Sequence, residues 1–405
     1  MAKEIITAID VGTTKIATII AAPTPEGLKV LGYGVTHSKG LHKGLVVNIT
    51  EAKETIKNSI QLAEQASGKK VESAYVGVTG RNINSVNKKG TVSIPRNDRL
   101  VRTNDLKRVL QSARSFTVPH DQKLLHVIPR QYAIDGQGGV KQPVGMHGSK
   151  LDVETHIITA AVSSIQNLVK SVKGAGIDID DLVLEPLASS EAVLRDDEKS
   201  KGVALADIGG GTTDIAIFKE GSIWHTAIIP VAGYQITRDI AVDLGVLFDT
   251  AEQLKRKYGT VKPIGNGVAD TTVSLNTDES GVSYQDLTDI VKARAEEIIK
   301  LIALELPTNA EKEIPGGLVL TGGCSNLAGL APLAEEMLGM PVRIGIPTGV
   351  FGIADILPDP TYATGVGLLL WGAKQTGASQ QNWQTRGVGD GFRRFVVRIR
   401  KLIGR

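Results

Sequence analysis

The sequence contains little sulfur and few aromatic residues. Cys324 is its single cysteine, so no internal disulfide can form, which fits a reducing compartment. Aromatic residues make up 4% of the chain, and this scarcity argues against a surface on which nucleic-acid bases stack. No apolar run approaches the eighteen residues of a membrane-spanning helix, and Glu4 with the short apolar stretch after it is not typical of a signal peptide. We therefore expect a cytosolic protein that does not bind nucleic acid.

Acidic residues are absent from the last fifteen residues, 391–405, which hold six arginines and lysines. The whole chain has a net charge of +3, whereas residues 1–390 hold 40 basic and 43 acidic residues. The positive charge is therefore a property of the tail, and the body of the protein shows no charge signature of nucleic-acid binding.

Glycine is the residue type in excess, at 45 of 405 residues, or about 11% against a usual ~7%. Apolar residues make up 41% and charged residues 22%, values that exclude a largely disordered chain. At ~150 residues per domain, the length predicts two or three domains.

One sequence pattern occurs twice. An apolar strand ends in Asp10-x-Gly-Thr-Thr in the first copy and in Asp207-x-Gly-Gly-Gly-Thr-Thr in the second, and each copy continues into another strand. The second copy then turns at 219–221 into a strand over 222–229, which predicts a β-meander. Helical spacing predicts helices at about 51–67 and 237–258. The repeat therefore predicts an α/β fold of two related halves around a cleft.

Two insertions interrupt these halves. The stretch 82–163 has a polar entry, a helix near 104–115 and a Gly/Pro-rich segment, which together predict a small α+β subdomain. A second insertion over 226–307 ends in a helix at about 286–306. After residue 373 we expect a flexible linker over 374–390 and a separate helix over 391–405.

The two Gly/Thr turns are candidate phosphate cradles, because glycines allow a tight turn whose N–H and hydroxyl groups donate to phosphate oxygens. The first turn comprises Asp10, Gly12, Thr13, Thr14 and Lys15, and the second comprises Asp207, Gly209, Gly210, Gly211, Thr212 and Thr213. Asp10 and Asp207 would hold Mg²⁺ through water. A single copy could equally be an ordinary tight turn, but two matched copies favour phosphate binding. The Walker A pattern is absent from the sequence.

Three further groups are candidates on weaker grounds. Gly322, Gly323 and Cys324 follow an apolar strand at 317–320, where glycines would let an adenine lie against the backbone, although an ordinary strand–helix turn has the same pattern. Glu252 and Lys255 could bracket a nucleoside or simply pair with each other. Glu185, with Asp207, is a candidate catalytic residue that could orient the attacking water in nucleotide hydrolysis; alternatively, Glu185 is an acid at a helix start.

The tail has the pattern of an amphipathic helix. At 100° per residue, its apolar residues Phe392, Phe395, Val396, Ile399, Leu402 and Ile403 share one face, and the basic residues, among them Arg393, Arg394 and Arg400, occupy the rest. A helix docked on a protein core rarely carries so much positive charge without facing acids. We therefore expect residues 391–405 to bind an anionic membrane surface.

The paired Asp-x-Gly hairpins and the Thr-Gly-Gly turn resemble those of the actin, sugar-kinase and heat-shock-chaperone ATPase superfamily. Within it, the chain resembles the FtsA family of bacterial cell-division proteins. The resemblance rests on Ile128–Gly136, Pro143–Gly148, Gly233–Ala241, the Ala251–Lys255 stretch and the tail, and it covers essentially the whole chain. Ala232 departs from the family, which usually has a second glycine beside Gly233 there.

The resemblance implies an actin-like fold with ATP and Mg²⁺ bound between the halves, Gly233 being one of the ATP contacts. It also implies self-assembly into filaments, tethering by the C-terminal helix to the cytoplasmic face of the cell membrane at the division septum, and recruitment of late divisome membrane proteins. Subdomain 2B would bind the C-terminal tail of FtsZ, with Lys292, Arg294 and Lys300 as candidate contacts.

In the family's subdomain terms, we expect 1A over 1–81 and 164–191, with a return at 355–373. The inserted 1C spans 82–163. Subdomain 2A covers 192–225 and 308–354, and 2B covers 226–307.

Three other functions are considered. A carbohydrate or small-acid kinase of the same superfamily would need a catalytic base beside an acceptor pocket and would not need a basic tail. A chaperone ATPase would carry a β-rich peptide-binding domain after the nucleotide core, where only about thirty residues remain. A pilus-assembly relative shares much of the fold, but the basic tail and the sequence motifs of the 82–163 insert argue against this function. Whether ATP is hydrolysed stays open.

Overall fold

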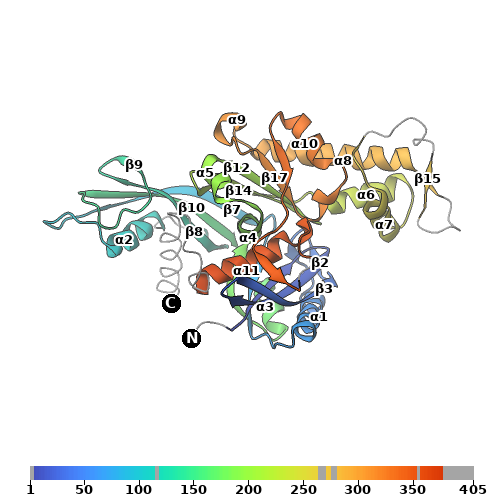
Figure 1. The fold of residues 1–405 in the computed structure, drawn as a ribbon, viewed down its shortest axis with the longest axis horizontal. Helices are drawn as coiled ribbons and strands as arrows, with labels where there is room; N and C mark the ends of the chain where they lie inside the picture. The colour runs from blue at the N-terminus through green and yellow to red at the C-terminus, as the bar shows by residue number, and fades with distance from the viewer. Residues whose placement is uncertain (1–3, 115–117, 263–270, 275–280, 354–355, 377–405) are drawn as a thin grey trace.

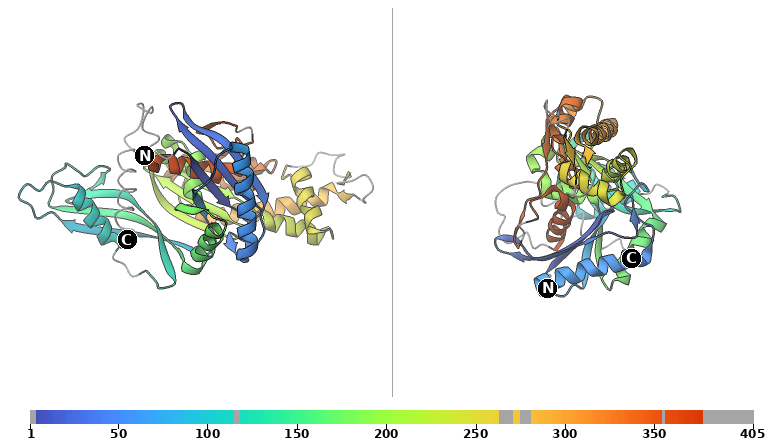
Figure 2. Two further views of the ribbon diagram at one scale, coloured as in Figure 1. Left: turned by 90° about the horizontal axis from the view of Figure 1, so that it is seen from below. Right: turned by 90° about the vertical axis from the view of Figure 1, so that its right-hand side faces the viewer.

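The computed structural model describes residues 4–114, 118–262, 271–274, 281–353 and 356–376. Each half of the molecule is built on a sheet that contains one copy of the repeated hairpin. A side lobe extends from each half, and the two lobes lie at opposite ends of the long axis of the molecule (Figures 1 and 2). One lobe is the inserted four-stranded sheet, and the other is a group of helices.

The first half is a six-stranded sheet in the order β11-β6-β1-β2-β3-β19. Its strands are β1 (Ile6–Val11), β2 (Lys15–Thr24), β3 (Gly27–His37), β6 (Ser73–Val78), β11 (Asp178–Leu184) and β19 (Val350–Gly352). Alternate residues of β2 point to opposite faces: Thr18 bonds to Ser59 of α1 (Ile49–Ser67), whereas a Cβ on Gly365 of α11 (Ala363–Thr376) would meet Ile19. Helix α3 (Val162–Gly174) packs beside α1, and α4 (Glu185–Val193) packs beside α11.

The second half is a five-stranded sheet in the order β14-β13-β12-β17-β18. Its strands are β12 (Val203–Ile208), β13 (Thr213–Lys219), β14 (Ser222–Ile229), β17 (Leu318–Thr321) and β18 (Val342–Ile344). Strands β12 to β14 form the predicted meander. The short helices around the sheet are α5 (Asp196–Lys201), α9 (Ala310–Glu313), α10 (Leu330–Leu338) and the 3₁₀ turns η1 (Gly323–Asn326) and η2 (Pro360–Tyr362).

The inserted subdomain has its own sheet and core. Its strand order is β7-β10-β8-β9, with β7 (Ile83–Ser93), β8 (Gln122–Ile134), β9 (Gln137–Val140) and β10 (Lys150–Ala161). Helix α2 (Thr103–Arg114) buries Leu106, Val109 and Leu110 against the sheet around the fully buried Tyr132. The predicted α+β character of this insertion is therefore confirmed.

The helical lobe differs from its sequence-based prediction. The single helix expected over 237–258 is two helices, α6 (Gly233–Asp243) and α7 (Phe248–Tyr258). The chain turns between them at Gly245, whose φ of +66° is a conformation that glycine adopts readily. The long helix α8 (Tyr284–Glu305) covers both of them, next to the strands β15 (Thr272–Val273) and β16 (Val282–Ser283).

Three expected boundaries are wrong by a few residues. Strand β14 runs to Ile229, past the boundary expected at 226. Strand β19 pairs with β3 of the first sheet, so the chain returns to the first half by Val350 rather than at 355. Helix α11 continues to Thr376, so the linker cannot begin at 374. The tail expected at 391–405 lies outside the described residues.

A polar joint connects the inserted subdomain to the second half. The side chains of Ser85 and Asn87 on β7 donate to the carbonyl oxygens of Thr226 and Trp224 on β14, at 3.0 and 3.2 Å. The guanidinium carbon of Arg130 lies 3.6 Å from the centre of the Trp224 indole ring. The insertion therefore contacts both halves, although the sequence places it within the first.

Within the described ranges, no helix combines the length and apolarity needed to cross a lipid bilayer.

Candidate functional site

A cavity of about 370 Å³ lies between the two halves. Of the predicted nucleotide and catalytic residues, those that line it are Asp10, Gly12, Thr13, Thr14, Lys15, Glu185, Asp207, Gly209, Gly210, Gly211, Thr212, Gly233, Glu252, Lys255, Gly322, Gly323 and Cys324. Thr213 is the exception, because it is fully buried in β13 and its hydroxyl donates to the carbonyl oxygen of Val231. Residues from six separate stretches of sequence thus meet at one place.

The first hairpin turns tightly between β1 and β2. The N–H of Gly12 donates to the carbonyl oxygen of Lys15 at 3.1 Å, and a Cβ on Gly12 would lie only 2.9 Å from the same oxygen. The ammonium group of Lys15 lies 3.2 Å from Asp10 Oδ2 and 4.8 Å from the centre of the Tyr362 ring. This hairpin places one cation and two threonine hydroxyls at the cavity.

The second hairpin is supported from behind by the start of α6. The N–H groups of Gly233 and Tyr234 donate to the carbonyl oxygens of Gly209 and Gly210, at 3.2 and 2.7 Å. Added Cβ atoms on Gly210 and Gly211 would collide with the side chains of Thr14 and Thr13 of the first hairpin. The two glycine turns therefore touch each other where they border the cavity, and only residues without side chains fit at these two positions.

Four carboxyl groups gather at the end of the cavity where the two hairpins meet, which we call the phosphate end. Asp207 Oδ2 accepts hydrogen bonds from the hydroxyls of Ser189 at 2.6 Å and Thr364 at 3.1 Å, and Asp214 Oδ1 accepts one from Thr79 at 2.6 Å. Glu185 begins α4, as the alternative interpretation expected, but it is 93% buried and its Oε1 atom has no hydrogen-bond partner. Asp10, paired with Lys15, is the fourth.

The same cluster shifts the acidity of its members. Burial raises the pKa of Asp207, and burial raises the pKa of Asp214 to about 8, with the Asp207 charge adding to the shift. Burial, followed by the charges of Asp10, Asp214 and Asp207, raises the pKa of Glu185 well above its usual range. Carboxyl groups are thus concentrated here beside one ammonium group, that of Lys15, and a bound cation would favour their ionised form.

The other end of the cavity is formed by α6, α7 and η1. Gly322 needs its φ of +83°, and a Cβ there would lie 2.6 Å from the carbonyl oxygen of Ile208. The thiol of Cys324 donates to the carbonyl oxygen of Gly209 at 3.3 Å. Glu252 and Lys255 pair with each other at 2.6 Å and both bond to Thr237 while still lining the cavity. The structure therefore contains the pairing of Glu252 with Lys255, which was one of the two interpretations of these residues.

Several lining residues were not predicted from the sequence. They are Thr79, Asp214, Arg256, Gly259, Asn326, Leu327, Thr361 and Thr364. Asp214 could have been found, because it occupies the place in the second repeat that Lys15 occupies in the first. Thr79 and Thr364 follow no repeated motif and are brought in only by the folding of β6 and α11.

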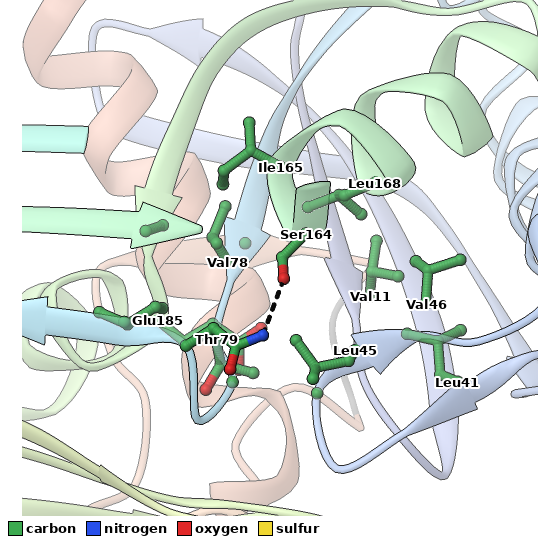
Figure 3. Close-up of a pocket in the computed structure, with 16 residues that line it drawn as sticks. Val11, Leu41, Leu45, Val46, Val78, Thr79, Ser164, Ile165, Leu168 and Glu185 are labelled. Atoms are coloured by element: carbon green, nitrogen blue, oxygen red, sulfur yellow. Dashed lines mark hydrogen bonds between the residues drawn. The ribbon is translucent and has the colours of Figure 1, made fainter. Parts of the chain in front are cut away.

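A second, smaller cavity lies behind Glu185 and Thr79, which line both spaces. Its volume is about 20 Å³, enough for one water molecule. Figure 3 shows Leu41, Leu45 and Val46 on one side of it, with Thr79 and Glu185 on the other. Among the lining residues, the amide of Asn82 donates to the hydroxyl of Ser164 at 3.1 Å. We call this space the back cavity.

The candidate cations of α8 have different surroundings. Arg294 is held by Asp239, with Nε 2.6 Å from Oδ2, and by Glu297 one turn later. The hydrogen bond to Asp239 raises the pKa of Arg294 further. Lys292 is half-buried and Lys300 is exposed. The membrane candidates Phe392 to Ile403 lie outside the described residues.

Comparisons with known proteins place this geometry in a family. The family model "Cell division protein FtsA" matches residues 204–367, and "SHS2 domain inserted in FTSA" matches residues 80–159. Cell division protein FtsA of Pseudomonas aeruginosa is 42% identical over 377 residues, which cover 92% of this chain and 90% of that protein. The FtsA of Escherichia coli K12 is 32% identical, with 98% of both chains covered.

Solved structures share the fold at lower identity. A PilM–PilN type IV pilus biogenesis complex matches with a TM-score of 0.66 and 17% identity, covering 92% of this chain and 99% of that one. MreB5 of Spiroplasma citri bound to ADP matches with a TM-score of 0.56 and 13% identity, covering 94% and 99%. These likenesses confirm the predicted actin-like fold. The identity to the FtsA proteins over nearly the whole chain establishes that this chain belongs to the FtsA family of cell division proteins.

Proposed function

We propose that this protein binds ATP between its two halves and works as a membrane-tethered filament that holds the FtsZ ring at the division septum. The observation that carries the proposal is the pair of glycine hairpins facing each other on one cavity. Glycine and threonine residues of both turns line this cavity, and glycine turns of this kind bind phosphate through backbone N–H groups. The family membership supports the role in cell division.

Magnesium fits the carboxyl groups at the phosphate end. Among the described residues, no three His, Cys, Asp or Glu side chains are arranged to hold a metal ion by themselves. A magnesium ion would therefore be held by Asp10 and Asp207 through water, together with phosphate oxygens. It would supply positive charge to a region in which burial disfavours ionised carboxylates. Glu185 and Asp207 are the residues that we propose for any hydrolysis.

The helical lobe is the proposed site for the FtsZ tail, an acidic and apolar peptide. Lys292, Arg294 and Lys300 on α8 offer positive charge. The ion pair of Arg294 with Asp239 holds the guanidinium group in place. The inserted subdomain, at the other end of the molecule (Figure 1), is the proposed site for late divisome membrane proteins.

Membrane attachment is proposed for residues 391–405, on the charge and apolar pattern of their sequence. The test is co-sedimentation of the protein with anionic liposomes in ATP and Mg²⁺, comparing the full chain with a chain that ends at Asp390. We expect filaments on the membrane for the full chain and loss of membrane binding on truncation. Equal sedimentation of both chains would place the anchor elsewhere, and no sedimentation of either would remove the tether from the proposal.

A further inference from the structure

The small hairpin between β3 and α1 has an unusual residue at its tip. Strands β4 (Leu41–His42) and β5 (Leu45–Val46) pair through a two-residue turn of Lys43 and Gly44. Both turn residues have positive φ, +48° for Lys43 and +74° for Gly44. Asparagine and glycine adopt this conformation readily, whereas lysine is disfavoured in it. A lysine held in such a backbone conformation beside a candidate site points to a role for its side chain.

The base of this hairpin is held in place by apolar side chains that line the back cavity. Leu41, Leu45 and Val46 line that cavity opposite Thr79 and Glu185 (Figure 3). The fit is close, since a Cβ on Gly80 would lie 2.7 Å from Leu45 Cδ2. The apolar side chains therefore hold the hairpin in one position, and its tip is not a free loop.

The tip reaches both glycine hairpins of the cleft. The N–H of Gly44 donates to the hydroxyl oxygen of Thr13 at 3.0 Å. A Cβ on Gly211 would lie 2.9 Å from the Cα of Lys43. The backbone of Lys43 thus lies beside the junction of the first and second hairpins, just outside the residues that line the cavity. We expect the last phosphate of a nucleotide cradled by both hairpins at this junction, within the length of a lysine side chain.

An aromatic contact ties the same tip to the second half. The ring of His42 lies edge-on to the ring of Tyr234, with 5.7 Å between centroids and 88° between planes. The N–H of Tyr234 in turn donates to the carbonyl oxygen of Gly210 at 2.7 Å. The position of Lys43 is therefore set by contacts with both halves of the molecule.

Few protein cations line the phosphate end of the cavity. Asp10, Glu185, Asp207 and Asp214 face a single lining ammonium group there, that of Lys15, which already pairs with Asp10. The other lining cations, Lys255 and Arg256, pair with Glu252 at the far end. Lys43 is half-buried, and in the part of the chain that the structure describes no carboxylate pairs with it.

From these observations we propose that Lys43 binds the terminal phosphate of the nucleotide and so makes the site prefer ATP to ADP. This inference rests on the proposed function, namely that the cavity takes ATP. Lysine suits the role, because its ammonium group on a long flexible chain donates to phosphate oxygens from several directions. The β4–β5 hairpin is then a third phosphate-binding turn, and its ligand is the phosphate that ADP lacks.

The test is the affinity of the full chain for ATP and for ADP, each with Mg²⁺, by titration calorimetry. Lys43→Asn removes the charge and places at this position a residue that tolerates positive φ, so the variant should unfold at the same temperature as the wild type or higher. We expect its affinity for ATP to fall about tenfold, as for the loss of one charge-assisted hydrogen bond, and its affinity for ADP to change less than threefold. Lys39→Asn, an exposed lysine just before the hairpin, should change neither affinity.

Two results would overturn the inference while leaving ATP binding in place. One is an unchanged affinity of the Lys43→Asn variant for ATP. The other is an equal loss of affinity for ATP and ADP, because the residue would then not respond to the terminal phosphate. A wild-type chain that binds neither nucleotide would instead refute the proposed function, and the role of Lys43 with it.

Discussion

The Nε2 atom of His156 lies 2.9 Å from the hydroxyl oxygen of Thr226, so that a buried imidazole joins the inserted subdomain to the second half. The Nδ1 atom lies 2.7 Å from Asn87 Oδ1. Because that amide oxygen can only accept, Nδ1 carries the proton and Nε2 accepts from Thr226. This arrangement is complete only for a neutral histidine. Burial, together with the nearby charges of His225 and Arg130, lowers the pKa of His156 to about 3.

Acid should therefore weaken this joint. In the unfolded chain the histidine gains its proton below about pH 6.5, whereas the folded state resists protonation down to about 3, so stability falls as the pH drops through that window. The slope should reach about 1.4 kcal/mol per pH unit. His156→Gln should flatten the fall in melting temperature between pH 7 and 5, and the exposed control His120→Gln should not. Identical slopes in all three proteins would contradict the assignment.

The buried Asp214 should make the nucleotide-free protein less stable as the pH rises, which is the opposite of the effect of His156. Its pKa is raised to about 8 from an ordinary value near 4, so the folded state holds a proton that the unfolded state has lost. Stability from this group is present below about pH 4 and is lost as the pH rises to about 8.

Asp214→Asn keeps the acceptor for Thr79 and removes this titration. The variant should therefore have a higher melting temperature than the wild type at pH 8 and a similar one at pH 5. The exposed Asp243→Asn should behave as the wild type does at both values. A variant that is less stable at pH 8 would show that the carboxylate is needed in its ionised form.

Forcing the two glycine hairpins apart should abolish nucleotide binding. A valine side chain at Gly210 would occupy the space of the Thr14 side chain, where a Cβ already comes 2.8 Å from its Oγ1. Gly210→Val should lower the affinity for ATP at least 100-fold while the protein stays folded. Gly209→Ala is the matched control, because its Cβ has one neighbour, Thr212 O at 3.3 Å, and we expect a loss below tenfold. Retained affinity in Gly210→Val would move the phosphates elsewhere.

Reversing the charge on α8 should weaken binding of the FtsZ tail. Arg294→Glu removes the guanidinium group and places a negative charge beside Asp239 and Glu297. The dissociation constant for an FtsZ C-terminal peptide should rise at least tenfold, as measured by fluorescence anisotropy. Lys312→Glu, an exposed reversal on α9, controls for the change in net charge. If both variants bind the peptide equally well, the contact surface lies outside the middle of α8.

Glu185→Gln separates nucleotide binding from any turnover. Burial raises the pKa of Glu185 well above its usual range, so a neutral amide of the same shape should leave the affinity for ATP within about threefold. If the protein hydrolyses ATP through this residue, phosphate release should fall at least tenfold. An unchanged rate would assign the water-orienting role to another group.

Much of the site was predictable because it is built from local motifs. The residues of each glycine hairpin are contiguous, and the repeat of Asp10-x-Gly at Asp207-x-Gly showed that two such hairpins belong together. Thr79 and Thr364 were not predictable, since their contacts with Asp214 and Asp207 join residues 135 and 157 positions apart in the chain. The same reason explains the misplaced boundary near 355, because the pairing of β19 with β3 depends on the fold and not on neighbouring residues.

The side chains of Ser85 and Asn87 have a consequence for solubility. Strand β14 is the last strand of its sheet, and an outer strand with unpaired carbonyl groups is a template on which another chain can add a strand. Ser85 and Asn87 take up two alternate carbonyl groups of this strand, those of Thr226 and Trp224. The inserted subdomain thereby protects the second half against uncontrolled strand-to-strand aggregation.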